Sequence, residues 1–147
     1  MGLINSMRTS ASALMAQRLR MDVIANNVAN VNSTRGENGL PYRRQSVVFR
    51  AQGAGSSFGD LLGRATGSGK PAGVEVAKIH QDTSAPRKVQ DPTHPDADAE
   101  GYVYLPNIDV TTEMTDLVGA SRAYQASVTV INATKAIAQS ALDIGRR

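Results

Sequence analysis

Acidic residues at alternate positions, Asp96, Asp98 and Glu100, precede Gly101 and resemble the first half of a calcium-binding loop. Such a loop takes oxygen ligands at its first, third and fifth positions, has glycine at the sixth, and closes with a bidentate glutamate at the twelfth. The twelfth position here is Asn107, which lacks the closing carboxylate. The pattern therefore favours an exposed acidic turn over a calcium site.

Two other patterns that could do chemistry are incomplete. The segment 67–70 is similar to the end of a phosphate-binding loop, but Arg64 stands where the first glycine is needed and Pro71 where a serine or threonine is needed. His80 and His94 are far apart in the sequence with prolines between them, so a shared site is not expected. We therefore predict that the chain is not an enzyme and has no catalytic residue, no cofactor and no metal ion.

The composition indicates a thin core and no dense basic patch. There is no tryptophan, and there are 2 phenylalanines and 4 tyrosines, although large aromatic residues supply much of the burial in compact cores. The net charge of +3 is dispersed, whereas nucleic-acid binders usually concentrate it. Arg8 and Arg18 interrupt the stretch where the apolar part of a cleavable signal peptide would stand. If the protein leaves the cytoplasm, we expect another export route.

The first segment, 4–31, is predicted to be a long helix that ends in a group of asparagines. Its apolar residues alternate in spacing between three and four, which is the pattern of a coiled-coil seam. The asparagines could simply end the helix or could form hydrogen bonds between subunits. The seam is Ile4, Met7, Ala11, Leu14, Arg18, Met21, Ala25 and Val28, and the asparagines are Asn26, Asn27, Asn30 and Asn32.

The last segment is predicted to be a longer helix, capped by Asp109 or Thr111. Two sets of small or apolar residues repeat along it at spacings of three and four, so it offers two packing faces. A helix in a simple hairpin needs one such face, so we expect neighbours on two sides. The first set is Val110, Met114, Leu117, Ser121, Tyr124, Val128, Ile131, Lys135, Ala138 and Leu142, and the second runs from Ala120 to Ile144.

Between the helices the sequence predicts a loose, partly β-structured insertion. Positions 42–49, 74–80 and 101–105 are predicted strands, and the Gly- and Ser-rich stretch 51–73 is expected to be flexible. The fold class is thus mainly α, with a helical coiled-coil domain formed by 1–32 and 106–147. Residues 33–105 form the insertion.

Several motifs resemble the bacterial flagellar rod, hook and hook-associated protein family. The segment 22–32 (DVIANNVANVN) is similar to its N-terminal signature, and 91–102 (DPTHPDADAEGY) precedes Pro106 and Asn107 as in the FlgC family of rod subunits. The loop that leads to Pro41 and Tyr42 is similar to the longer FlgC version, and the last helix, with 121–126 (SRAYQA), also resembles that family.

The resemblance implies a structural subunit of the proximal rod, the periplasmic drive-shaft of the flagellum. Members leave the cytoplasm through the flagellar type III export apparatus without signal cleavage, and their terminal helices pack as a coiled coil. Implied partners are other copies and rod subunits of the FlgB, FlgF and FliE types, with no nucleic acid and no small-molecule substrate. The residues expected at assembly interfaces are Met7, Leu14, Met21, Val28, Met114, Leu117, Tyr124, Val128 and Ile131.

Other functions are weaker interpretations of the same pattern. A soluble helical adaptor could use the seams on one partner, and it would form a small saturable complex instead of an open-ended assembly. A basic nucleic-acid-binding protein is a third interpretation and an enzyme a fourth. The segment 58–62 also fits a short hydrophobic pattern similar to one that early flagellar export substrates use, although so short a pattern often arises by chance.

Overall fold

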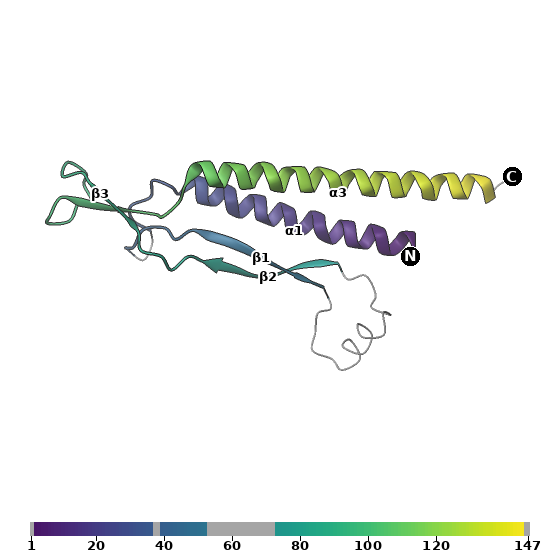
Figure 1. Ribbon diagram of the computed structural model, residues 1–147, viewed down its shortest axis with the longest axis horizontal. Coiled ribbons are helices and arrows are strands. Elements are labelled where there is room, and N and C mark those ends of the chain that lie inside the picture. Colours follow the sequence, from purple (N-terminus) through teal and green to yellow (C-terminus); the bar gives the residue numbers. More distant parts are fainter. Residues whose placement is uncertain (1, 37–38, 53–72, 146–147) are drawn as a thin grey trace, which may run out of the picture.

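The computed structural model of the chain describes residues 2–36, 39–52 and 73–145. The elements are α1 (Leu3–Ala29), β1 (Gln45–Ala51), β2 (Val74–Gln81), β3 (Arg87–Gln90), β4 (Tyr102–Leu105) and α3 (Val110–Gly145). Long terminal helices around a small β-containing middle were predicted, and this arrangement is confirmed (Figure 1). The stretch expected to be flexible lies almost wholly outside the described residues, as does the short hydrophobic pattern at 58–62.

Helix α1 forms the middle layer of an elongated molecule. It packs along α3 on one side and along the β1–β2 hairpin on the other (Figure 1). Within the described residues, the backbones of α3 and of the hairpin strands are not neighbours. The core is thin, as the composition predicts: among the described residues its buried apolar side chains are Ala16, Val23, Ile24, Val103, Pro106, Ile108 and Ala120.

The asparagine group ends α1. The backbone N–H and the side-chain Nδ2 of Asn30 both donate to the carbonyl oxygen of Asn26, which satisfies a helix-end acceptor. Ser33 Oγ in turn donates to the Asn30 carbonyl oxygen at 3.0 Å. The helix therefore stops at Ala29, two residues before its predicted end.

Helix α3 begins after a side-chain cap. The carboxylate of Asp109 accepts from the backbone N–H groups of Thr111 and Thr112 at 3.2 and 3.3 Å, and from the Thr112 hydroxyl at 2.6 Å. These are the free donors of a first helical turn, so Asp109 is the cap and Thr111 is not. The helix has 36 residues against 27 in α1, and near its C-terminal end it runs past the start of α1 (Figure 1).

The β1–β2 hairpin is antiparallel, with Gln45 opposite Gln81 and Ala51 opposite Val74. The end of the hairpin at Ala51 and Val74 is fixed to α1, because Ser12 Oγ accepts from the Val74 N–H at 3.0 Å. Gly73 is buried beside this contact, where a Cβ atom would collide with the Ser12 hydroxyl. Seven strand residues span about 23 Å, which matches about 15 helical residues between Asn27 and Ser12.

A second antiparallel pair, β3–β4, extends beyond the helices, with Arg87 opposite Leu105 and Gln90 opposite Tyr102 (Figure 1). Strand β4 was predicted, but β3 was not. Its sequence, RKVQ, contains one strong β-former and is exposed throughout, so its own pattern carries no strand signal. Among the described helices, none has the length and apolar character that crossing a bilayer requires.

Candidate functional site

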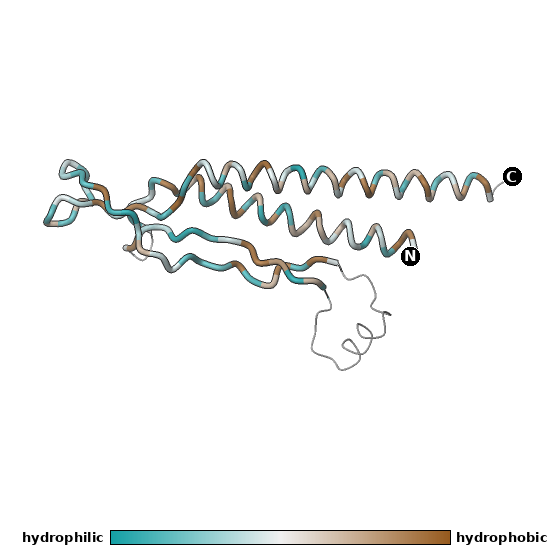
Figure 2. The backbone as a smooth tube through the Cα atoms, viewed as in Figure 1, coloured by the Kyte–Doolittle hydropathy of each residue, from teal (hydrophilic) through white to brown (hydrophobic). Residues whose placement is uncertain are grey.

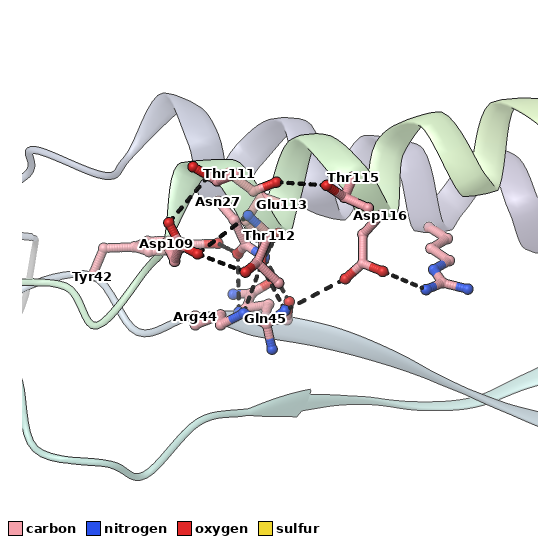
Figure 3. Close-up of polar contacts among 11 residues, drawn as sticks. Asn27, Tyr42, Arg44, Gln45, Asp109, Thr111, Thr112, Glu113, Thr115 and Asp116 are labelled. Atoms are coloured by element: carbon pink, nitrogen blue, oxygen red, sulfur yellow. Dashed lines mark hydrogen bonds and ion pairs between the residues drawn. The ribbon is translucent and has the colours of Figure 1, made fainter.

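Polar side chains from three segments meet in the interior where α1 ends and α3 begins (Figure 3). We call this group the polar junction. Its members are Asn27 on α1, Tyr42, Arg44 and Gln45 where β1 begins, and Glu113 on α3. Such a group is stable only when every buried donor and acceptor has a partner.

Asn27 is the centre of the junction and is 0% exposed. Its Nδ2 donates to the Gln45 carbonyl oxygen at 2.7 Å and to Glu113 Oε2 at 3.0 Å. Its Oδ1 accepts from the Tyr42 hydroxyl at 3.0 Å and from the Gln45 N–H at 2.9 Å. All four hydrogen-bonding positions of the amide are therefore filled within the chain.

Glu113 is 1% exposed and lies between two donors. One oxygen accepts from Asn27, and Arg44 binds the other through Nε and Nη2, both at 2.6 Å. A buried carboxylate is costly unless it is paired and hydrogen-bonded, and here both conditions are met. Arg44 Nη2 also lies 3.8 Å from Asp116, which forms a more exposed ion pair with Arg20 at 3.3 Å.

The junction also changes the acidity of a neighbouring phenol. Partial burial raises the pKa of Tyr42, and the negative charge of Glu113 raises it further. Both effects disfavour the phenolate. The hydroxyl is therefore held as the donor that Asn27 Oδ1 requires.

From the junction, a seam of side chains from α3 faces α1. Glu113, Ala120 and Thr134 are fully buried, and residues between them at spacings of three and four are half-buried. Three predicted interface residues, Leu117, Tyr124 and Ile131, belong to this half-buried set. They contribute to packing within the chain.

The predicted seam of α1 contains none of the residues that are buried on that helix. The buried residues of α1 are Ala16, Val23, Ile24 and Asn27. Leu14 stands two residues before the buried Ala16, so their side chains point about 160° apart around the helix. Leu14, Met21 and Val28 are half-buried, and Met7 is 36% exposed.

Helix α3 also carries an exposed face without charge, which we call the outer stripe. Small residues occupy its first half and mostly larger ones its second half, at spacings of three, four or seven residues. Val130, Ile137 and Ile144 are 45%, 57% and 78% exposed. Apolar positions recur along α3 to its C-terminal end (Figure 2). The members are Gly119, Ala126, Val130, Ala133, Ile137 and Ile144.

At the end opposite the junction, the helices leave an apolar groove between them. It is lined by Leu3, Ile4 and Met7 of α1 and by Ala138, Ala141 and Leu142 of α3, with Gly2 and Asn5. Ile4 is 80% exposed and Leu142 is 71% exposed. We call this region the open end, since its apolar side chains have no cover within the described residues.

The acidic turn stabilises its own loop. The carboxylate of Asp98 accepts from the N–H groups of Tyr102 and Glu100 and from the Tyr104 hydroxyl, and these bonds lower its pKa. Asp96 accepts from the Thr34 hydroxyl at 2.7 Å and so joins the turn to the loop after α1. Across the described ranges, no three His, Cys, Asp or Glu residues lie together as a metal site would require.

The two histidines lie in separate places. His80 is exposed on β2, and His94 Nδ1 accepts from the Asp96 N–H at 3.1 Å within the acidic loop. The motif residues Pro41, Tyr42, Pro106 and Asn107 gather around one small cavity of about 80 Å³ beside the junction. Among the motif asparagines, Asn27 and Asn30 bond within the chain, and Asn26 and Asn32 are exposed.

Sequence reasoning missed the central roles of Glu113 and Arg44. An isolated acidic residue in the first turn of a predicted helix is usually a surface residue that favours the helix dipole. The signal that could have identified Glu113 is its place on the buried face, since it stands seven residues before Ala120 on the same seam. Arg44 offered no comparable signal, because its partner is 69 residues away.

Comparisons with known proteins agree with this arrangement. The family model described as "Flagella basal body rod protein" matches residues 7–36, and the one described as "Flagellar basal body rod FlgEFG protein C-terminal" matches residues 99–144. These ranges contain most of α1 and nearly all of α3, with Asn27 in one and Glu113 in the other.

Curated relatives match almost end to end. The chain is 49% identical to the flagellar basal-body rod protein FlgC of Bacillus subtilis, with 97% of each chain covered. It is 44% identical to FlgC of Borreliella burgdorferi, with 98% of each covered. It is 40% identical to FlgC of Salmonella typhimurium over 99% of this chain and 100% of the relative. The chain therefore belongs to the FlgC family of flagellar basal-body rod proteins.

Proposed function

We propose that this chain is a structural subunit of the flagellar basal-body rod and that it assembles by packing its terminal helices against neighbouring subunits. The observation that carries the proposal is the pair of apolar regions that the fold leaves uncovered, the outer stripe and the open end. Membership of the FlgC family supplies the assembly in which such surfaces are covered.

The outer stripe suits helix packing in particular. Its residues repeat at the coiled-coil spacing, so a neighbouring helix could lie along it over several turns. Glycine and alanine in its first half allow a close approach of backbones, and larger residues in its second half supply apolar area. Each large side chain that becomes fully buried contributes roughly 1.5–3 kcal/mol. We infer that a coiled coil, within the subunit and between subunits, is the packing mode.

We further propose the finer details that the family resemblance implies. The subunit occupies the proximal rod in the periplasm, reaches it through the flagellar type III export apparatus, and contacts copies of itself and sister rod subunits of the FlgB, FlgF and FliE types. The expected interface residues Met7, Leu14, Met21, Val28, Met114 and Val128 remain proposals, as does a division into helical domain and insertion. Its role is mechanical, with no catalysis.

The test is complementation of a strain that lacks this gene. Wild-type protein is expected to restore swimming and to appear in purified hook-basal bodies. Ile137→Asp places a charge on the outer stripe and should abolish both, because an interface would have to bury an unpaired carboxylate. Gln125→Asp, at an exposed position of α3 that is already polar, is the matched control and should swim normally.

Two outcomes would count against the proposal. Normal swimming with Ile137→Asp would show that the outer stripe is not an assembly surface. Normal flagella in the deletion strain, with the protein remaining in the cytoplasm, would favour a soluble helical adaptor that forms a small, saturable complex.

A further inference from the structure

The α3 side of the seam between α1 and α3 repeats every seven residues. From Glu113 to Ala138, the positions of α3 that face α1 follow spacings of four and three. After Glu113, no member of this series is charged. A helix pair that slid by seven residues would therefore still bring small and apolar side chains together. Each such slip moves one helix along the other by about 10 Å. The facing series is Glu113, Leu117, Ala120, Tyr124, Ser127, Ile131, Thr134 and Ala138.

The junction is the feature that distinguishes one register from the next. In a pair slipped by one repeat, Asn27 would face Ala120 in place of Glu113. The amide would lose an acceptor, and Arg44 would lose the carboxylate that it now contacts at 2.6 Å. Buried donors without partners are strongly disfavoured, whereas an apolar side chain at the same place would be indifferent to the slip.

The direction of the hydrogen bonds makes this selection strict. Tyr42 and the Gln45 N–H both donate to Asn27 Oδ1, so its Nδ2 must point at Glu113. Arg44 donates to Glu113 from the other side. The residue at position 113 must therefore accept at both of its terminal atoms, which a carboxylate does and a glutamine amide cannot.

We propose that the contact between Asn27 and Glu113, held by Arg44, sets the register in which α1 and α3 pair and so fixes how far α3 extends past the start of α1. These three are positioning residues. A single buried polar contact in a repetitive apolar seam is a known way to select register at some expense of stability. This inference goes beyond the proposed rod function and does not depend on it.

The test replaces the polar contact by apolar residues and measures register directly. The double variant Asn27→Leu with Glu113→Leu removes both buried polar groups together, and Arg44 is exposed enough to turn to water. The chain has no cysteine, so Arg18→Cys on α1 and Ala136→Cys on α3, both at exposed positions, provide two unique spin-label sites. Pulsed electron–electron double resonance on the purified full chain then gives the distance distribution between the two spin labels.

The expected result is one narrow distance for the labelled chain with Asn27 and Glu113 intact. In the double-leucine variant we expect a second population displaced along the helix axis by about 10 Å, with the helical circular dichroism retained. A single unchanged distance in that variant would overturn the proposal, because the apolar seam and the connections would then set the register alone. Loss of the helical signal would also overturn it, since the contact would then supply the stability of the pair and not its register.

A matched control uses the other polar contact between the same helices. Arg20→Ala with Asp116→Ala removes an ion pair at 3.3 Å whose side chains are 37% and 39% exposed. It lies close to the junction but has access to water, so its loss leaves no buried donor unsatisfied. We expect the wild-type distance here. A second population in this control would assign the register to any polar contact between the helices, and the specific role of Asn27 and Glu113 would be wrong.

Discussion

The two ends of the helix pair differ in how their side chains are satisfied. At the polar junction, Asn27 and Glu113 are almost completely buried and every hydrogen-bonding position of Asn27 has a partner within the chain. At the open end, Ile4 and Leu142 are largely exposed although both are apolar. One end has its polar groups satisfied within the chain, and the other leaves apolar side chains exposed. The difference teaches that the buried polar contacts of the subunit and the open end that we propose for assembly lie at opposite ends of the same two helices.

The largest effect on the subunit itself is expected from Glu113→Ala. Removing one partner of a buried ion pair typically lowers the free energy of unfolding by about 3–5 kcal/mol, and partial access of Arg44 to water places this case near the lower figure. Urea denaturation followed by circular dichroism measures it. Glu75→Ala removes an exposed ion pair with Arg50 and should change the same quantity by less than about 1 kcal/mol. Equal losses in both variants would remove the distinction between the junction and the surface.

Gly73→Ala tests how tightly the β1–β2 hairpin packs against α1. The added methyl group would collide with the Ser12 hydroxyl and lie 2.8 Å from Gln52 Oε1, so the hairpin or these two side chains must shift. Overpacking of this kind typically costs about 1–3 kcal/mol. The control is Gly119→Ala on the outer stripe, where nothing lies within 4 Å and the helix should gain slightly. A stable Gly73→Ala protein would mean that the contact with Ser12 is loose.

Ionisation of the Tyr42 hydroxyl at high pH is a milder perturbation of the polar junction than the substitutions above. Burial and the charge of Glu113 raise the pKa of this hydroxyl in the folded chain, so this phenol contributes stability that is present below its ordinary pKa of about 10. That stability is lost as the pH rises through the higher folded value, when the phenolate can no longer donate to Asn27. NMR titration of ring-labelled tyrosine measures the midpoint, with Tyr42→Phe to assign the signal. Glu113→Gln should move the midpoint downward, and an unmoved midpoint would contradict the stated effect of the charge.

The smallest effect on unfolding is expected at the open end. Leu142→Asp changes a side chain that is 71% exposed, so the free energy of unfolding should change by no more than about 0.5 kcal/mol. Swimming of a strain that carries the variant should nevertheless fail, because the charge would lie in the region offered to neighbours. A variant that unfolds readily would show that the open end is already closed within the subunit. One that swims normally would remove the open end from the assembly surface.

The sequence predicted the helices and most strands well, for physical reasons that differ between elements. Long runs of helix formers with regular apolar spacing define α1 and α3 without reference to the rest of the chain. Strand β3 escaped notice because its residues 87–90 are exposed and gain order only by pairing with β4. Elements whose order depends on a distant partner leave a weak local pattern.

The site was less predictable than the fold. Counting apolar residues selected positions that include Met7 and Leu14, whereas the buried positions of α1 include the polar Asn27. From sequence alone, an asparagine such as Asn27 is expected at the surface, because its partners lie 18 and 86 residues away along the chain. On α3 the buried and half-buried positions come from both predicted sets, so neither set alone marks the face against α1: Leu117, Tyr124 and Ile131 belong to the first, and Ala120, Ser127 and Thr134 to the second.

Helix α3 is nine residues longer than α1, since it has 36 residues against 27, and the extra length of about 13 Å lies at the open end (Figure 1). In a stack of such subunits, the boundaries between neighbours along one helix would not coincide with those along the other. Each subunit would then span the boundary between its neighbours. A torque applied at one end would be transmitted through continuous helices and not only across the interfaces between subunits. A shaft that turns under load would gain the same property from unequal helices.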